Sequence, residues 1–125
     1  MDFVLLSTDW VDAIHDAVLN PGELPGRARD KSLDGALGRV ENRLAYGLIG
    51  DVFDLAAAYC VAVAQGHCFN DGNKRTAFRV MQVCLDLHGL AEPALPEDTL
   101  GQVVIRVAQG QMEEAALADW LRERA

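Results

Sequence analysis

The chain has few cysteines and no pattern that pairs them. Cys60, Cys68 and Cys84 are an odd number at unrelated spacings, which excludes the disulfide framework of a small secreted domain. The first residues lack the basic start and long apolar run of a secretory signal. The most apolar segment, residues 52–64, is shorter than the roughly 20 residues of a membrane span, and Asp54 interrupts it. We therefore expect a cytoplasmic protein that does not contact a membrane.

Positive charge is also scarce. The chain has 11 Lys and Arg residues against 19 Asp and Glu residues, a net charge of −8. Binding along a nucleic-acid backbone requires clustered basic residues, so we expect no direct nucleic-acid binding. The overall acidity favours solubility or a partner with a basic surface.

The remaining composition is that of a folded protein. A length of 125 residues fits one domain over residues 1–125. Half of the residues are hydrophobic and 24% are charged, as in ordinary globular domains. Folding at this length buries roughly two-thirds of the chain's surface, which is sufficient for a core without disulfides or a structural metal.

Apolar residues recur at helical spacing, and no segment alternates as a strand does. The segment 51–65 is apolar on nearly all sides, which is typical of a helix at the centre of a bundle, with Asp51 placed to cap it. We predict an all-α bundle of about six helices around this segment. The first predicted helix follows a hydroxyl cap at Ser7 and Thr8 and ends at Asn20. The other predicted helices are residues 33–43, 51–65, 72–88, 97–109 and 112–124.

The connections follow from the turn-forming residues. We expect a loop at 21–30, a turn or short extended flap at 44–50, and another loop around Pro93 and Pro96. Trp10 and Trp120 are expected to pack between the terminal helices.

The segment between the third and fourth predicted helices contains groups that bind anions. Residues 66–77 read Gly-His-Cys-Phe-Asn-Asp-Gly-Asn-Lys-Arg-Thr-Ala. A helix N-terminus presents backbone N–H groups and the positive end of its dipole. Gly72 permits close approach to the backbone, and Lys74 and Arg75 add two cations at the same place.

Two further side chains complete the parts that phosphoryl transfer requires. Asp71 is an oxygen ligand of the kind that Mg²⁺ prefers, and Mg²⁺ usually binds through one or two carboxylates plus substrate phosphates. His67 is a histidine, the residue type that most readily takes a proton near neutral pH.

This pattern resembles the signature His-x-Phe-x-(Asp/Glu)-Gly-Asn-x-Arg of the Fic/Doc family, in the form with Lys that characterises Doc (death on curing) toxins. The segments 24–26, 38–40 and 43–46 are also similar to Doc at matching distances, so the resemblance spans nearly the whole chain. The matching motif positions are His67, Phe69, Asp71, Gly72, Asn73, Lys74 and Arg75.

The resemblance implies a role for each matched residue. His67 would be the catalytic base and Asp71 would hold Mg²⁺. Phe69 would anchor the loop in the core. Nucleotide phosphates of ATP would be bound by Gly72, Asn73, Lys74 and Arg75.

The resemblance also implies which group is transferred. Relatives that transfer a nucleotide have Gly where this chain has Lys74, and the longer Fic pattern has a second Arg where this chain has Phe78. Doc-type enzymes with the Lys are associated with an ATP orientation opposite to that in the relatives that transfer a nucleotide. The implied function is that of a type II toxin, a protein kinase that transfers the γ-phosphoryl group to a threonine of elongation factor Tu and blocks translation.

Restraint is expected from a separate protein. The sequence contains no inhibitory helix of the form (Ser/Thr)-x-x-x-Glu-(Gly/Asn). The resemblance therefore implies a Phd-like antitoxin, itself the DNA-binding member of the pair. It would dock an amphipathic helix in an apolar groove between helices.

Other interpretations remain open. The chain could be a nucleotidyl transferase that adds AMP to a protein hydroxyl, or a catalytically inactive binding module. Asp71 could be only the N-cap of the following helix. Cys68 beside His67 is not expected to be a nucleophile, because adjacent side chains in a loop point apart. His15 and His88 are expected to be structural or surface residues.

Overall fold

The computed structural model describes residues 2–90 and 97–124, and every element longer than a single bridge in them is helical. The one β-bridge in this part of the chain joins Arg27 to Phe69. The all-α prediction is therefore confirmed. The helices are α1 (Thr8–Val18), α2 (Leu33–Ala45), α3 (Val52–Gly66), α4 (Asn73–Leu87), α5 (Glu97–Ala108) and α6 (Glu114–Arg124).

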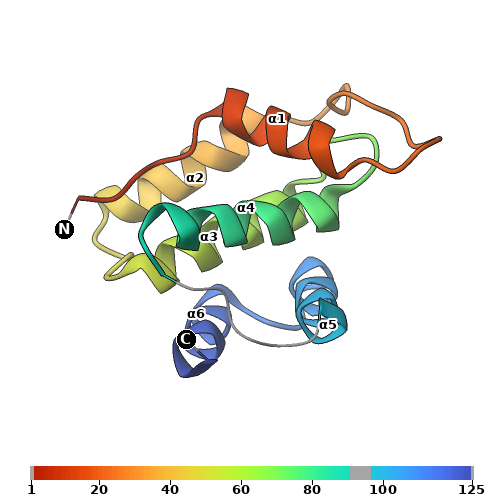
Figure 1. The fold of residues 1–125 in the computed structure, drawn as a ribbon. Helices are drawn as coiled ribbons and strands as arrows, with labels where there is room; N and C mark the ends of the chain where they lie inside the picture. Colours follow the sequence, from red (N-terminus) through yellow and green to blue (C-terminus); the bar gives the residue numbers. More distant parts are fainter. Residues whose placement is uncertain (1, 91–96, 125) are drawn as a thin grey trace.

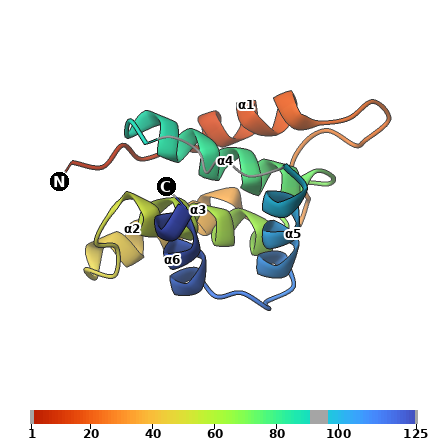
Figure 2. The same cartoon turned by 60° about the horizontal axis from the view of Figure 1, so that its bottom comes forward.

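Helix α3 is the centre of the bundle, as its apolar sequence predicts. In Figure 1, α1 and α2 lie on one side of the α3–α4 pair, and α5 and α6 lie on the other. Figure 2 shows α4 between α1 and α3. Most of α3 is buried, including Ala56, Ala57 and Ala58. Because small side chains let helices approach closely, α3 contacts α2, α4, α5 and α6.

The predicted helix boundaries differ from the observed ones by about two residues at most. The Ser7 hydroxyl accepts a hydrogen bond from Trp10 N–H, and the Asp51 carboxylate accepts one from Asp54 N–H, so both caps form as expected. Helix α2 extends into the predicted turn, to Ala45. The turn follows it, held by backbone hydrogen bonds from Gly47 N–H to the Leu44 carbonyl and from Leu48 N–H to the Arg43 carbonyl. The loop expected around Pro93 and Pro96 lies outside the described residues.

The prediction for Trp10 is wrong. Its side chain is 48% exposed, whereas Val11 and His15 form the buried stripe of α1. Trp10 precedes that stripe by one residue, so the helical rotation turns it toward solvent. Trp120 does pack against the core, and the Arg124 guanidinium lies 4.4 Å from its ring centroid.

His88 ties the N-terminal segment to the end of α4. Its Nδ1 lies 2.7 Å from the Cys84 carbonyl oxygen, and its Nε2 lies 2.9 Å from Val4 N–H. A carbonyl oxygen only accepts and a backbone N–H only donates, so Nδ1 carries the hydrogen and Nε2 accepts. The structural role expected for His88 is confirmed.

The lengths of the helices also bear on membrane insertion. The longest ones in the described ranges, α3 and α4, have 15 residues each. No helix within residues 2–90 and 97–124 is long and apolar enough to span a membrane.

Candidate active site

The candidate site is built on the loop of residues 67–72, which joins α3 to α4. His67 follows the last residue of α3 and has left-handed backbone angles, with φ of 49°. Residues other than glycine rarely adopt this conformation. Gly72, at the other end of the loop, has φ of 77° and directly precedes α4. The chain therefore turns sharply at both ends of the loop, and the His67 side chain is exposed.

Phe69 anchors this loop in the interior, as expected. Its side chain is 2% exposed. The Asn73 amide brackets its backbone: Oδ1 accepts from Phe69 N–H at 3.0 Å, and Nδ2 donates to the Phe69 carbonyl at 2.9 Å. The side chain of Asn73, predicted to bind phosphate, thus holds the loop in this structure.

The loop of residues 19–32 holds the other edge of the motif. Ala28 N–H donates to the Cys68 carbonyl at 2.7 Å, and Asn70 N–H donates to the Gly26 carbonyl at 3.2 Å. Leu24 N–H donates to Oδ2 of Asp71 at 2.7 Å. One oxygen of the Asp71 carboxylate is therefore fixed by a backbone group from a distant part of the sequence.

His15 of α1 also holds the motif, and sequence reasoning missed this role. The side chain is 1% exposed, and its ring stacks on Phe69. Its Nε2 lies 2.7 Å from the Asp71 carbonyl oxygen, so Nε2 must donate. The available signal was its place on the apolar stripe of α1, because a buried polar side chain almost always has a partner.

All six residues predicted for the site line one polar pocket, which we call the motif pocket. Its volume is about 340 Å³. The lining residues are His67, Asp71, Gly72, Asn73, Lys74 and Arg75, together with Glu23, Ala64 and Asn70. A proton acceptor, a carboxylate, two cations and the start of α4 are therefore brought together.

The start of α4 faces this pocket without a competing side-chain cap. The N-cap residue is Gly72, and no side chain makes the capping hydrogen bond. The alternative in which Asp71 is the N-cap is wrong, because its carboxylate accepts from Leu24 instead. The backbone N–H groups and the dipole of α4 are thus directed at the pocket that Lys74 lines.

Glu23 is a second residue that sequence reasoning missed. Its carboxylate accepts hydrogen bonds from the Arg75 guanidinium and from Asn20 N–H. The Arg75 hydrogen bond, followed by the Asn20 bond, holds the pKa of Glu23 below its usual value. Lys74 and Arg75 are therefore balanced in formal charge by Glu23 and Asp71 within one pocket. The attraction of the motif pocket for anions must therefore come mainly from the N-terminus of α4 and from any bound cation.

The motif pocket could bind Mg²⁺ only if substrate phosphates supplied further oxygen ligands. Among the described residues, no three or more His, Cys, Asp or Glu side chains lie together as a metal-binding group. Asp71 offers one carboxylate that is oriented from both its backbone and its side chain. Such a donor set matches Mg²⁺, which completes its shell with water and substrate phosphates.

Cys68 does not share the pocket with His67. Its side chain is 1% exposed, and its thiol donates to the Ser32 carbonyl at 3.5 Å. Burial raises the pKa of this thiol, which disfavours the reactive thiolate. The structure thus gives no support to a Cys–His pair.

Comparison with known proteins agrees with the motif. A family model described as the Fic/DOC family matches residues 5–85. The chain belongs to the Fic/Doc family. It is also 37% identical over 118 residues to the protein kinase Doc of Escherichia phage P1, across 94% of this chain and 92% of that relative.

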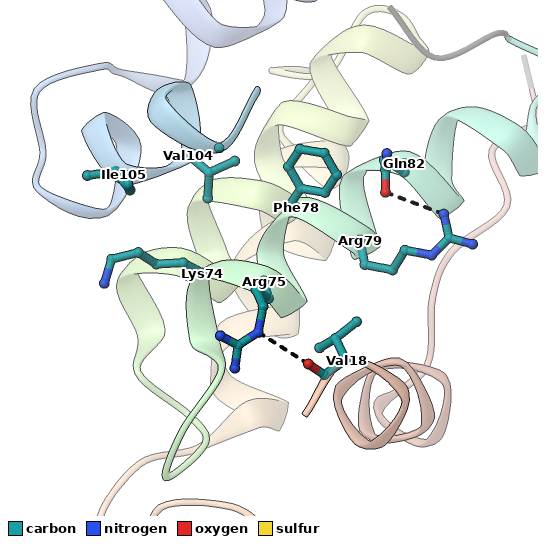
Figure 3. Close-up of a pocket in the computed structure, with 9 residues that line it drawn as sticks. Val18, Lys74, Arg75, Phe78, Arg79, Gln82, Val104 and Ile105 are labelled. Atoms are coloured by element: carbon teal, nitrogen blue, oxygen red, sulfur yellow. Dashed lines mark hydrogen bonds between the residues drawn. The ribbon is translucent and has the colours of Figure 1, made fainter. Parts of the chain in front are cut away.

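A second pocket adjoins the Fic/Doc motif and lies between α1, α4 and α5 (Figure 3). We call it the α4–α5 pocket, and its volume is about 340 Å³. Lys74 and Arg75 line both pockets. The other lining residues are Val18, Phe78, Arg79, Gln82, Gly101, Val104 and Ile105.

Proposed function

We propose that this Fic/Doc protein is the toxin of a type II toxin–antitoxin system and acts in the cytoplasm as a protein kinase. It transfers the γ-phosphoryl group of ATP to a threonine of elongation factor Tu and so blocks translation. The observation that carries the proposal is the composition of the motif pocket, in which His67 and Asp71 lie with the cations at the start of α4. The printed name of the phage P1 relative, a protein kinase, supports this class of reaction.

In the proposed reaction, the His67 imidazole takes the proton of the target hydroxyl. The hydroxyl oxygen forms a bond to the γ-phosphorus while the bond from that phosphorus to the β–γ bridging oxygen breaks, and ADP leaves. Lys74, Arg75 and the N–H groups of α4 bind the phosphate oxygens. Asp71 would hold Mg²⁺, which would neutralise part of the phosphate charge.

Lys74 favours γ-transfer over nucleotidyl transfer. Its side chain lines the motif pocket next to Gly72, where relatives that transfer a nucleotide have only backbone at the matching place. A lysine chain there reduces the room for an α-phosphate and its ribose. It offers a point charge that suits a terminal phosphate better.

The test is a labelling experiment in a bacterial extract. Purified protein, Mg²⁺ and ATP labelled on either the γ- or the α-phosphorus are added, with a His67→Ala control. Label from the γ-position alone, on a protein of the size of elongation factor Tu, is expected. Label from the α-position would make the protein a nucleotidyl transferase. The absence of His67-dependent label, with elongation factor Tu added in excess, would favour an inactive binding module.

The antitoxin part of the proposal has its own test. A Phd-like partner is proposed to place an amphipathic helix in a groove between helices of the bundle. Co-expression with the neighbouring open reading frame, followed by size-exclusion chromatography, is expected to give a complex that does not phosphorylate. A chain that elutes alone and remains harmless in cells would contradict this part.

A further inference from the structure

A third pocket is lined by residues of α2, of α3 and of the start of α6, elements that lie together in Figure 2. We call it the α2–α3 groove, and its volume is about 380 Å³. Ala58 and Ala62 of α3 are buried at its base, and Tyr46 and Leu48 line it from the turn after α2. Tyr46 is 81% exposed and Leu48 is 57% exposed. Single exposed apolar side chains are ordinary, but two beside one groove are typical of a contact surface.

The α2–α3 groove also contains unpaired positive charge. Among the described residues that line it, Arg39 and Arg43 face a single carboxylate, that of Glu114. Arg43 pairs with Glu114, with 2.7 Å between Nε and Oε2. Arg39 is exposed and makes no hydrogen bond or ion pair within residues 2–90 and 97–124. In a chain with a net charge of −8, this local excess of positive charge favours an acidic partner.

The α2–α3 groove begins close to His67, the base of the proposed reaction. Gln65 lines the groove, whereas Ala64 and His67 line the motif pocket, so both pockets border the last turn of α3. From Ala58 to His67 the distance along α3 is about 13–14 Å, at about 1.5 Å per residue. An extended peptide spans this distance with about four residues. A chain that presents a hydroxyl at His67 can therefore reach the groove with a side chain about four residues away.

We infer that the α2–α3 groove docks an acidic segment of the protein substrate, an inference that rests on the proposed function. A carboxylate of this segment pairs with Arg39, and an apolar side chain beside it packs against Tyr46 and Leu48. Tyr and Arg are enriched among the residues that contribute most to protein binding. The motif pocket is occupied by the nucleotide phosphates and the target hydroxyl in the proposed reaction. Selection of one protein among many must therefore come from contacts outside that pocket.

Steady-state transfer kinetics with purified elongation factor Tu, Mg²⁺ and γ-labelled ATP test the inference. Arg39→Glu and Tyr46→Ala are each expected to raise the KM for elongation factor Tu about tenfold, with kcat and the KM for ATP unchanged. Both residues are exposed, so both variants should fold. Arg106→Glu makes the same change of charge at an exposed residue of α5, and Trp10→Ala removes another exposed aromatic side chain. These two variants are the matched controls and should leave all three constants unchanged.

Salt provides a second measurement, which a purely structural role of Arg39 would not change. The KM of the parent protein for elongation factor Tu should rise with added NaCl, because salt screens exposed ion pairs. In Arg39→Glu this rise should be absent or reversed, since the introduced carboxylate repels an acidic segment. Arg106→Glu should keep the salt dependence of the parent protein.

The outcomes separate this inference from the proposed function. A KM for elongation factor Tu that is unchanged in both Arg39→Glu and Tyr46→Ala would overturn the inference, even if the parent protein transfers the γ-label. A fall in kcat alone would also overturn it, because the groove would then act on the reaction and not on binding. If the variants lose a co-expressed antitoxin but keep the KM, the groove binds the antitoxin and the inference is wrong.

Label from the α-phosphorus, or label on a different protein, would instead correct the proposed function. The same KM comparison, made with that label and that protein, would still decide whether the α2–α3 groove docks the substrate.

Discussion

The imidazole ring of His15 lies parallel to the phenyl ring of Phe69, with centroids 3.9 Å apart and planes 9° from parallel. The same ring donates from Nε2 to the Asp71 carbonyl. One buried side chain of α1 therefore fixes both the anchor of the motif loop and the residue expected to hold Mg²⁺. The packing of α1 on α4 therefore contributes directly to the conformation of the loop.

We predict that His15→Phe lowers both the stability of the protein and its response to Mg²⁺, although the new ring can still stack on Phe69. The new ring keeps the stacking surface but leaves the Asp71 carbonyl without its donor, at a cost of about 1–3 kcal/mol in the free energy of unfolding. The Mg²⁺ concentration for half-maximal transfer should rise several-fold. Thermal unfolding and a Mg²⁺ titration of activity measure the two effects.

Two further variants identify the cause. His15→Gln keeps a donor and should restore part of the Mg²⁺ response. His88→Phe removes a structural histidine at the far end of α4 and should lower stability without moving the Mg²⁺ midpoint. An unchanged Mg²⁺ midpoint in His15→Phe would mean that this contact does not position Asp71.

His67 should be dispensable for folding and indispensable for transfer. Its left-handed φ of 49° costs an ordinary residue about 1–2 kcal/mol, a cost that glycine avoids. We predict that His67→Gly unfolds at a temperature no lower than the parent protein while transfer falls at least about a hundredfold. His67→Ala should lose activity to the same degree. A glycine variant that is markedly less stable would show that the imidazole supports the fold.

Arg122 joins α6 to the start of α3. It donates from Nε and Nη2 to the Asp51 carboxylate, at 2.9 and 3.0 Å, and from Nη2 to Asp54 at 2.9 Å. The hydrogen bond from Arg122 holds the pKa of Asp51 below its usual value. Because the folded-state pKa is the lower one, the stabilisation is complete above the unfolded-state pKa of about 4. It is lost as the pH falls through the folded-state pKa.

We therefore predict that Arg122→Ala destabilises the protein at neutral pH and much less at pH 3. The Arg122 and Asp51 side chains are both 37% exposed, so solvent screening limits the expected loss to about 1–2 kcal/mol. Arg124→Ala on the same helix removes a cation–π contact with Trp120 and should cost about 0.5–1 kcal/mol at either pH. Urea unfolding at pH 7 and pH 3 measures both. A loss that does not shrink at pH 3 would place the effect in packing against Phe53.

The helices could be read from the sequence because their signals are local. Ser7 and Asp51 cap helices as their type and position predict, and the apolar run of α3 is buried as such runs usually are. Six of the nine residues that line the motif pocket were also found, because five of them are consecutive in the sequence. Trp10 was misplaced because a shift of one residue in helical phase moves a side chain from the core to solvent.

The contacts that orient the motif could not be predicted in the same way. His15 and Asp71 are 56 residues apart, and Glu23 and Arg75 are 52 apart. Such separations in sequence do not predict a contact. Only tertiary packing brings α1 and the loop after it to the start of α4. The sequence reveals which groups could do the chemistry, and the fold decides which partners hold them.

Glu23 should oppose nucleotide binding. Its carboxylate lies in the motif pocket and is paired with Arg75, the cation expected to bind phosphate. We predict that Glu23→Gln binds ATP up to about fivefold more tightly in the absence of Mg²⁺, because one negative charge facing the phosphates is removed. Asp12→Asn, which breaks a similar pair with Arg27 outside the pocket, is the control. Weaker binding by Glu23→Gln would show that Glu23 instead orients Arg75 for the phosphate.

Lys74→Gly tests the choice between the two transfer reactions at a single position. If the lysine side chain excludes an α-phosphate from the motif pocket, its removal should lower γ-transfer at least about tenfold, through the loss of a charge-assisted phosphate contact. It should also allow His67-dependent label from the α-phosphorus. Stability should fall by no more than about 1 kcal/mol, the usual cost of glycine in a helix.

A matched loss of charge separates the steric effect from the electrostatic one. Lys74→Met removes the charge but keeps a long side chain in the motif pocket, so it should weaken γ-transfer without gaining α-transfer. Parallel assays of the two variants with ATP labelled at each phosphorus give the comparison. Undiminished γ-transfer in Lys74→Gly would mean that bulk and charge at this position do not decide the reaction. The orientation of ATP would then have to be set by residues other than Lys74.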